Sequence, residues 1–574
     1  MKKRLVSMLM ILFGAAIVMA AIFASQLGLE QVVGWGRGRI LVLAIGLFIS
    51  ALFFLDFKWL HSRFVELLFF ARPIRTYVMT GICVLFVIAV YIWFVSIGQW
   101  TSWPRTTIYY DQLATAFQNG QLNLQIKVDP QLLALSDPYD PNQRSSVRRV
   151  DYIWDMSLYK GKVYLYWGPV PAFVLIPLQI ISSTKVGDDV LSFIFSAGLI
   201  LFQSLLMLKI WKHFFSSVPE WTVALGILVA GLTIPILYVL SYASVYEAAI
   251  TGAQFFFMGG LYFAVLAIDD QKLSLWKLTL AGILWSCAVN SRAFLLLPVI
   301  FMAVMVSLWI VRNLFRARDI GKTLQRLLAL GIPLALGAIA FGWYNWARFD
   351  SPLETGLRYQ ITNNDLNQLY SQVFQPSYIL PNLQAYLFRT FGLSRGFPFM
   401  TILEQASQMR SMFGWPIPPL YIAYGGIGMI AGAPFVLFAL IAVTTFIRDI
   451  FKKNSGQTDD QDQYQFRWLF VSLFGSFLLP FGGLLLLLNS AMKYMLDFMP
   501  CLILLAMIGL WQGYQLLEKK KRFRRLYATL VVGAGVYSFV TSALLALSIN
   551  AHRFLDKNPT LFNSLVNWFA KFIK

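Results

Sequence analysis

The polar stretch 111–171 places carboxylates beside aromatic rings, between two long hydrophobic parts of the chain. The side chains concerned are Asp111, Asp151, Tyr152, Trp154, Asp155, Tyr166 and Trp167. This combination suits a pyranose, because aromatic rings stack on the C–H face of a sugar while acids bind its hydroxyl groups. It equally suits an aromatic belt at a membrane interface that binds no ligand. Both interpretations stay open, and the candidate substrate contacts are Asp151, Asp155, Tyr166 and Trp167.

Asp111 stands at the start of Asp-Gln-Leu-Ala-Thr-Ala-Phe-Gln-Asn-Gly, a segment with the spacing of a short helix. Leu113, Ala116 and Phe117 share one face, and Gly120 is a natural helix end. We therefore expect an amphipathic helix from Asp111 to Gly120 that lies on the membrane. Asp111 is then either a functional carboxylate at the membrane surface or the N-cap of this helix, accepting backbone N–H groups.

Glu247 follows Tyr246 where another predicted helix begins near the membrane. An acidic side chain at a helix N-terminus is favoured by the helix dipole, so a capping role is one interpretation. Beside apolar surface, however, an ionised carboxylate is costly, and that cost is easier to explain if a hydroxyl group or a cation occupies the site. Glu247 is therefore a second candidate for a carboxylate that acts on a substrate.

Lys493 and Arg292 are the cations whose positions suit a phosphate group. Lys493 begins a predicted external helix end, and Arg292 lies between two closely joined spans. A lysine ammonium is a compact point charge for phosphate, and arginine binds the same group with paired N–H donors. Each cation also has a plainer interpretation, because its side chain can extend to the membrane interface. Lys493 can in addition pair with Asp497, four residues further on.

The composition places these residues in a membrane protein. The chain has 574 residues, of which 58% are hydrophobic and 13% charged, and its mean hydropathy is +0.64. Many apolar runs exceed the roughly 18 residues that a spanning helix requires. Backbone groups in lipid must be satisfied within the segment, so the spans are helices. The predicted fold class is an all-α polytopic membrane protein.

The charge pattern orients the chain and argues against nucleic acid as a partner. The net charge is +20, but the basic residues crowd short loops, as from Lys519 to Arg525. That pattern is typical of cytoplasmic loops in contact with anionic lipid. The three cysteines lie far apart in apolar runs, and the three histidines form no cluster. Neither a disulfide framework nor a histidine-based zinc site is therefore predicted.

From a cytoplasmic N-terminus, the hydrophobic runs predict about 13 spans, the first of them an uncleaved helix. They lie near 5–27, 39–56, 77–98, 190–211, 220–240, 246–268, 275–290, 292–311, 327–345, 418–447, 467–489, 496–514 and 526–549. The loops 99–188 and 345–419 then face outward, and the second adds Arg358 as a candidate substrate contact. The insert 450–466 is expected to be a solvated cytoplasmic loop.

The apolar run 168–183 does not fit this series of spans. It is about 16 residues long and contains three prolines, so a helix there reaches only about 24 Å. The hydrocarbon core is roughly 30 Å thick. We therefore expect an interfacial or re-entrant helix on the external face.

In their order along the chain, these features resemble the GT-C superfamily of membrane glycosyltransferases, in particular its bacterial branch with the aminoarabinose and RgtA/B/C/D-like transferases. The resemblance covers roughly 77–520. The matching features are Asp111 just beyond a span, the approach Gly161–Pro169 to a juxtamembrane helix, Glu247, Arg292 at a helix junction, Asn345–Gly356 and the helix start at Lys493. The order and topology of these loose motifs carry the resemblance.

The resemblance implies an inverting glycosyltransferase whose donor is a sugar on a polyprenyl phosphate or pyrophosphate. It makes Asp111 the general base and Glu247 the supporting acid. Lys493 and Arg292 become donor-phosphate contacts. A carboxylate beside bound hydroxyls can accept a proton during attack, and cations stabilise the departing phosphate. The acceptor is expected to be an envelope glycan, lipid or protein, at the outer face of the bacterial cytoplasmic (inner) membrane.

The same resemblance divides the chain into three parts. Residues 1–76 form two extra N-terminal spans, 77–520 the catalytic transmembrane core, and 521–574 the last span with an external C-terminal tail. Gln112 stands where the family often has an acid, and Tyr166-Trp167-Gly168-Pro169 replaces its Glu-Lys-Pro-Pro-like approach. These departures leave the use of a divalent metal, Mg²⁺ or Mn²⁺, and the donor-phosphate contact undecided.

Two other functions stay open. A transporter or flippase of lipid-linked glycans is also a helical bundle, although it should place ionisable groups near the membrane midplane and show broken helices in paired halves. The acids of this chain gather at one face instead. A non-catalytic envelope-assembly protein with the same fold is the third interpretation.

Overall fold

The described residues form two compact units. The computed structural model describes 13–29, 36–54, 72–147, 150–181, 185–269, 273–317, 319–402, 414–452 and 461–571. The first unit takes the described parts of Met1–Pro104, Leu393–Thr401 and Asn550–Lys574. The second takes those of Arg105–Gly392 and Ile402–Ile549, and it holds every candidate site residue.

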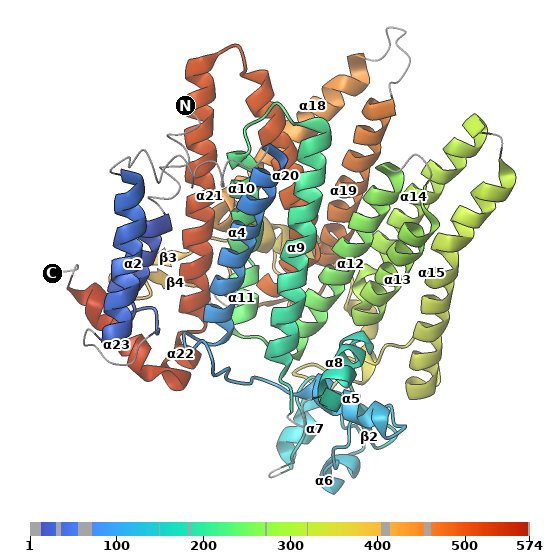
Figure 1. Cartoon of the computed structure of the whole chain (residues 1–574). Helices are drawn as coiled ribbons and strands as arrows, with labels where there is room; N and C mark the ends of the chain where they lie inside the picture. Colours follow the sequence, from blue (N-terminus) through green and yellow to red (C-terminus); the bar gives the residue numbers. More distant parts are fainter. Residues whose placement is uncertain are drawn as a thin grey trace. The chain divides into compact units, whose positions relative to one another are not determined.

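Nine helices of the described residues are long and apolar enough to cross a membrane. The elements that contain them are α4 (Arg72–Val95), α9 (Asp188–Phe214), α12 (Val245–Asp269), α14 (Leu296–Ala317), α15 (Ile320–Phe349), α18 (Ala439–Lys452), α19 (Gln461–Leu485), α20 (Met499–Leu516) and α21 (Lys521–Ile549). Figure 1 shows how helices dominate the chain. The predicted all-α polytopic class is confirmed, whereas the predicted number of 13 spans is not.

Several predicted spans differ from the helices that form. The run 220–240 is divided into α10 (Trp221–Leu232) and α11 (Ile236–Ser241), because Pro235 has no N–H to continue the helix. α13 (Leu275–Ser291) has 17 residues, one fewer than the shortest of the nine spans. The first predicted span, 5–27, and the insert 450–466 both extend outside the described residues.

The predicted span 418–447 is wrong in its first half. There the chain forms β5 (Ile422–Ala423), which pairs in parallel with β6 (Asn489–Ser490), followed by α17 (Met429–Gly432). Helix resumes with the 3₁₀ turn η7 (Pro434–Phe438), which leads into α18. Several glycines in 425–432 explain the change, because glycine weakens a helix interior.

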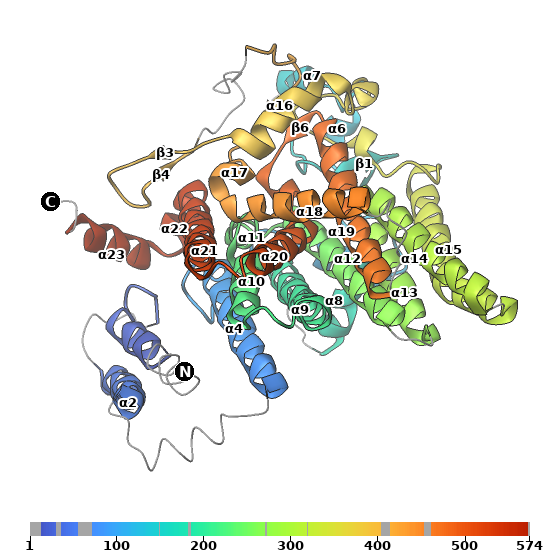
Figure 2. The same ribbon diagram turned by 90° about the horizontal axis from the view of Figure 1, so that it is seen from above.

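α20 is the central helix of the second unit. Nearly every residue from Met499 to Trp511 is buried, and Figure 2 shows α9, α10, α18, α19 and α21 around it. α15 differs, because it packs on α13 and α14 and exposes an apolar stripe. That stripe includes Leu328, Ile332, Leu336, Ile339 and Trp343. Its spacing of three and four residues is that of one helix face, suited to lipid.

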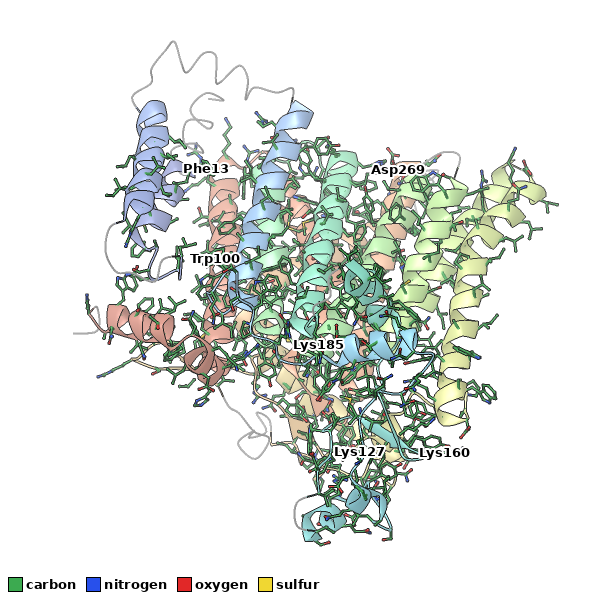
Figure 3. The ribbon with its side chains drawn as sticks, turned by 60° about the horizontal axis from the view of Figure 1, so that its bottom comes forward. Phe13, Trp100, Lys127, Lys160, Lys185 and Asp269 are labelled. Atoms are coloured by element: carbon green, nitrogen blue, oxygen red, sulfur yellow. The ribbon has the colours of Figure 1, made fainter. Side chains whose placement is uncertain are left out.

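Short elements cover one end of this bundle. They are α5 (Tyr109–Gln118), α6 (Pro130–Leu133), α7 (Pro141–Ser146), β1 (Ser157–Tyr159), β2 (Lys162–Tyr164) and α8 (Val170–Ile181). Figure 3 shows Lys127, Lys160 and Lys185 at this end and Asp269 at the opposite end. α8 has 12 residues and so measures about 18 Å, too short to span, as expected for 168–183.

The two long loops are joined to each other. Ser157 of β1 pairs with Gln360, and the Asp155 N–H donates to the Ile361 carbonyl at 2.9 Å. The buried guanidinium of Arg348 at the end of α15 donates to the Leu165 carbonyl. These bonds hold the β1–β2 hairpin, and the residues that follow it, in place.

The first unit contains α2 (Arg37–Phe54), α4, α22 (Ala551–Lys557) and α23 (Pro559–Ala570). The predicted C-terminal tail is therefore helical. The Asn558 side chain donates to the Ile97 carbonyl at 2.8 Å, and Phe397 stacks on Phe569 with ring centroids 5.5 Å apart. The C-terminal helices are thus attached to the segment that follows α4.

Candidate functional site

The site cluster is a group of charged and aromatic side chains where several helices begin. Its residues are Asp155, Tyr166, Trp167, Tyr246, Glu247, Arg292, Lys493, Tyr494 and Asp497. They come from the chain around the β1–β2 hairpin, from the first turn of α12, from the α13–α14 junction and from the 3₁₀ helix η8 (Met492–Asp497) that precedes α20. The structure thus brings together six of the nine predicted site residues from four segments far apart in sequence.

Glu247 is both a cap and an ion-pair partner. One carboxylate oxygen accepts the Ser244 N–H at 3.1 Å and the Ser244 hydroxyl, and the first of these bonds is the glutamate half of a capping box at the start of α12. The other lies 3.5 Å from the Lys493 ammonium. The Glu247 side chain is 4% exposed and that of Lys493 18%. Glu247 therefore caps α12 and also pairs with a cation.

Arg292 pairs with Asp497 rather than extending to the interface. Its Nη2 and Nε donate to one oxygen of Asp497 at 2.9 and 3.2 Å. The Asp497 side chain is fully buried, and its second oxygen has no hydrogen-bond partner among the described residues. Burial lowers the pKa of Arg292, but Asp497, Tyr494 and Tyr166 together oppose that effect, and the pKa is raised overall. The guanidinium is therefore charged within the bundle.

The pairing of Lys493 with Asp497, one of the alternatives that the sequence left open, does not form. Their segment is a 3₁₀ helix, in which residues three apart eclipse each other and residues four apart diverge. Lys493 therefore reaches Glu247 on α12, and Asp497 reaches Arg292 at the α13–α14 junction. Two ion pairs thus connect three separate helix ends.

Tyr246 connects the acids to the aromatic side chains. Its hydroxyl donates to Asp155, and the Lys493 ammonium lies 3.7 Å from its ring centroid, a cation–π contact. The Trp167 ring meets the Tyr246 ring edge-on at 4.7 Å, and the Tyr166 ring lies 3.9 Å from that of Trp167. Burial raises the pKa of Asp155, while Tyr246 and Lys493 oppose the rise.

Asp111 lies in a separate network. The helix α5 begins at Tyr109, and Asp111 occupies its first turn, 4% exposed. One oxygen of Asp111 accepts the Gln179 amide and the Val186 N–H, both at 2.9 Å. Asp111 is therefore not the N-cap of its helix, and its carboxylate joins α5 to α8 and to the segment before α9.

Asp188, which the sequence patterns did not single out, caps α5 instead. It is the first residue of α9, and its oxygens accept the N–H groups of Tyr109 at 3.0 Å and Tyr110 at 3.1 Å. The Thr107 hydroxyl donates to the same carboxylate and accepts the Val245 N–H at 2.8 Å. One buried network thereby fixes the starts of α5, α9 and α12.

Asp151 and Arg358 have contacts outside the site cluster. The exposed Asp151 donates its N–H to Asp129 at 2.9 Å. Arg358 lies 3.9 Å from Glu354 and 4.7 Å from the Tyr370 ring centroid, on the second long loop. Both remain predicted substrate contacts on the loop surface.

Within the described residues, no group of three or more His, Cys, Asp or Glu is arranged to hold a metal ion. The carboxylates of the site cluster are separated by their own partners, since Glu247 faces Lys493, Asp497 faces Arg292 and Asp155 accepts from Tyr246. Their oxygens therefore do not fit the Mg²⁺ or Mn²⁺ that the family resemblance left open.

Three residues of the site cluster were not singled out as site residues from the sequence: Tyr246, Tyr494 and Asp497. Arg292 lies 5.1 Å from the Tyr494 ring centroid. Burial raises the pKa of Tyr494 to about 12, so it stays a neutral hydrogen-bonding group. The sequence could have indicated them by proximity along the chain, because each of these residues stands within four positions of Glu247 or Lys493.

No family model and no curated protein matches the chain. Three solved structures are similar to it. The apo oligosaccharyltransferase of Archaeoglobus fulgidus has a TM-score of 0.41 and 13% identity, covering 82% of this chain and 56% of its own. A complex of that archaeal enzyme, AglB, with an inhibitory peptide and a dolichol-phosphate has a TM-score of 0.41 and 12% identity, with 85% and 59% covered.

The third is the S. cerevisiae protein O-mannosyltransferase Pmt1-Pmt2 complex bound to the sugar donor. Its TM-score is 0.43 at 10% identity, covering 83% of this chain and 90% of its own. The chain spans little more than half the length of the archaeal enzymes. At these TM-scores, the similarities assign neither a fold family nor an activity.

Proposed function

We propose that this chain is a membrane glycosyltransferase that uses a polyprenyl-phosphate-linked sugar as donor. The observation that carries the proposal is the pair of cations, Lys493 and Arg292. They are held at adjoining helix ends, near the rings of Tyr246 and Trp167. Buried cations are costly and are kept where they bind something. A phosphate can compete with Glu247 for Lys493, whose side chain is the most exposed member of the two ion pairs.

The aromatic side chains suit the sugar. The Tyr246 ring contacts Lys493 and the Trp167 ring contacts Tyr246, so a sugar attached to a bound phosphate lies close to these rings. Cations at the phosphate stabilise the charge that develops on the leaving group. In this proposal the acceptor is an envelope glycan, lipid or protein at the external face, and the anomeric carbon is inverted.

The proposal is tested by comparing two lysines that each pair with an acid. The full chain in lipid nanodiscs is titrated with decaprenyl phosphate, and Lys493→Met is compared with Lys209→Met. Lys209 pairs with Asp269 at the opposite end of the bundle. We expect Lys493→Met to weaken binding at least tenfold, which equals about 1.4 kcal/mol, and Lys209→Met to leave it unchanged.

Turnover is measured in the same nanodiscs. The wild-type chain is given a panel of decaprenyl-phosphate-linked hexoses, and the release of decaprenyl phosphate is followed by mass spectrometry. Release by the wild type and its loss in Lys493→Met supports a transferase. Equal phosphate binding by both lysine variants, or no release from any donor, contradicts the proposal.

A further inference from the structure

We infer that Asp155 is the general base that accepts the proton of the acceptor hydroxyl, and that Tyr246 is the residue that positions it. This inference rests on the proposed glycosyltransferase function. It assigns the proton transfer to an acid other than Asp111, whose carboxylate already connects α5 with α8.

The backbone holds Asp155 in the left-handed region. Its φ is 58°, which few residues with a Cβ adopt, although Asp and Asn do so more often than the others. Two hydrogen bonds fix it there, from the Asp155 N–H to the Ile361 carbonyl at 2.9 Å and from the Ile361 N–H to the Met156 carbonyl at 3.0 Å. Strain of this kind persists only where the surroundings over-determine it, and it gathers at functional sites.

The side chain of Asp155 points into the site cluster. One oxygen accepts the Tyr246 hydroxyl, and the other accepts no hydrogen bond from the described residues. The Tyr246 ring also contacts Lys493, the proposed phosphate ligand. Because one tyrosine joins both groups, Asp155 lies close to the bond that would break. Its half-buried setting raises its pKa, which favours proton acceptance near neutral pH.

The charged and titratable groups that face Asp155 come from four segments. They are Lys493 and Tyr494 on η8, Tyr246 on α12, Tyr166 after the hairpin and Tyr424 after β5. Lys493 is the one cation among them, and it opposes the effect of burial.

The other acids of the first polar loop and the site cluster are engaged elsewhere. Asp111 accepts hydrogen bonds from Gln179 and the Val186 backbone, and Asp497 is paired with Arg292. Glu247 accepts both Ser244 donors and faces Lys493. Asp155 differs from these acids. One of its oxygens accepts the Tyr246 hydroxyl and nothing else, and the other accepts no hydrogen bond from the described residues.

The proposed step breaks two bonds and forms two. The acceptor O–H bond breaks and its proton goes to the carboxylate of Asp155. The acceptor oxygen forms a bond to the anomeric carbon as the bond from that carbon to the phosphate oxygen breaks. The electron pair stays on the polyprenyl phosphate, beside Lys493. When water replaces the acceptor, the same step hydrolyses the donor.

Three conservative variants test the inference: Asp155→Asn, Tyr246→Phe and Asp111→Asn. Asparagine tolerates the left-handed region, so Asp155→Asn preserves the backbone and removes the charge. With decaprenyl-phosphate hexoses and water as acceptor, we expect Asp155→Asn to lower kcat about 100-fold. Its affinity for decaprenyl phosphate should stay within about threefold of the wild type. Asp111→Asn, when folded, should keep most of kcat.

Tyr246→Phe supplies a readout that a purely structural role would not move. The Tyr246 hydroxyl lowers the pKa of Asp155, so its removal raises that pKa. Because the base acts when deprotonated, the acidic limb of the pH–kcat profile should shift to higher pH. A folded Asp155→Asn variant with a kcat near wild type, or an unmoved limb in Tyr246→Phe, overturns the role of Asp155. No release by the wild type from any donor overturns the proposed function itself, and the role of Asp155 with it.

Discussion

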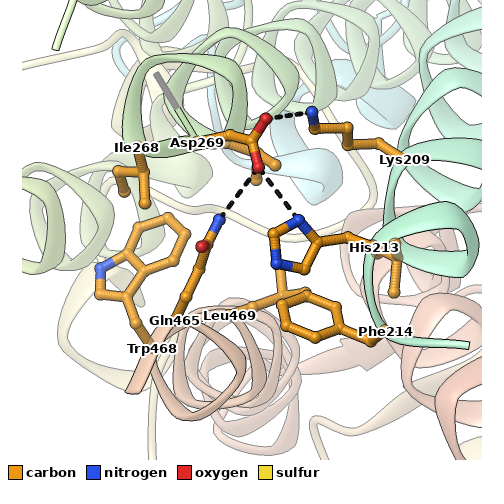
Figure 4. A pocket seen from close by; sticks show the side chains of 10 residues that line it. Lys209, His213, Phe214, Ile268, Asp269, Gln465, Trp468 and Leu469 are labelled. Carbon is orange, nitrogen blue, oxygen red and sulfur yellow. Dashed lines mark hydrogen bonds and ion pairs between the residues drawn. The ribbon is translucent and has the colours of Figure 1, made fainter. Parts of the chain in front are cut away.

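Two groups of charged side chains occupy opposite ends of the same helices, and they differ in burial. α12 is 25 residues long, so its two ends lie about 37 Å apart. Glu247 stands at its first turn in the site cluster, and Asp269 is its last residue. Asp269 pairs with Lys209 and His213 of α9 (Figure 4). His213 also lies 3.6 Å from Asp462 of α19.

The ion pairs of the site cluster are largely buried, whereas those of the opposite group are partly exposed. In the site cluster the ion-paired side chains are 0–18% exposed, and aromatic rings cover them. In the opposite group they are 25–70% exposed. Exposed pairs contribute little to stability, and a buried pair is costly to assemble and costly to break. The partly exposed pairs of the opposite group join α9, α12 and α19, and the burial of the other pairs agrees with the proposal that the site cluster binds a phosphate.

The largest effect is expected when Arg292 is replaced. Arg292→Met leaves Asp497 buried and uncompensated, which should lower the free energy of unfolding by about 3–5 kcal/mol. Thermal unfolding in detergent measures this loss as a fall in Tm. The double variant Arg292→Met/Asp497→Leu should recover much of it, because no buried charge remains, yet it should not recover donor turnover.

The pH dependence of Arg292→Met sharpens the same point. Burial raises the pKa of Asp497, and the charge of Arg292 opposes that rise. Without Arg292 the folded-state pKa rises further above its unfolded value. The folded protein then binds the proton more tightly, so the stability of Arg292→Met should increase as pH falls through that pKa. A Tm of Arg292→Met that does not rise as the pH falls would contradict the full burial of Asp497.

Glu247→Gln should have an intermediate effect. Glutamine can keep the capping box with Ser244, so the loss of stability should stay near 1 kcal/mol. Removing the negative charge frees Lys493 from its competitor, and decaprenyl phosphate should bind at least as tightly as to the wild type. Isothermal titration measures that affinity. Weaker phosphate binding would show that Glu247 does not compete for this lysine.

The smallest effect is expected at the opposite end. Lys209→Met and His213→Gln should each change the free energy of unfolding by at most about 1 kcal/mol, because their pairs are partly exposed. Donor turnover should be unchanged in both. A loss as large as that of Arg292→Met would erase the distinction between the two groups.

The sequence by itself determined the class of the molecule and the approximate location of several of its helices. The polytopic helical class follows from apolar runs long enough to span. The short α8 follows from the length and prolines of 168–183, because both depend on neighbouring residues alone. The helix α5 was expected within two residues of its true bounds for the same reason. The prediction of a span over 418–447 was wrong because a strand in its first half pairs with a strand more than sixty residues away.

Only the tertiary structure decided which charges meet. Local spacing allowed Lys493 and Asp497 to pair with each other, yet in the 3₁₀ helix η8 each pairs with a different helix end. Asp188 caps α5 although it lies 79 residues after Tyr109 and 78 after Tyr110 in the chain. Hydrophobic spacing identifies faces of helices, but it carries no information on which helix ends adjoin. Packing around α20 decides that, and with it the composition of the site.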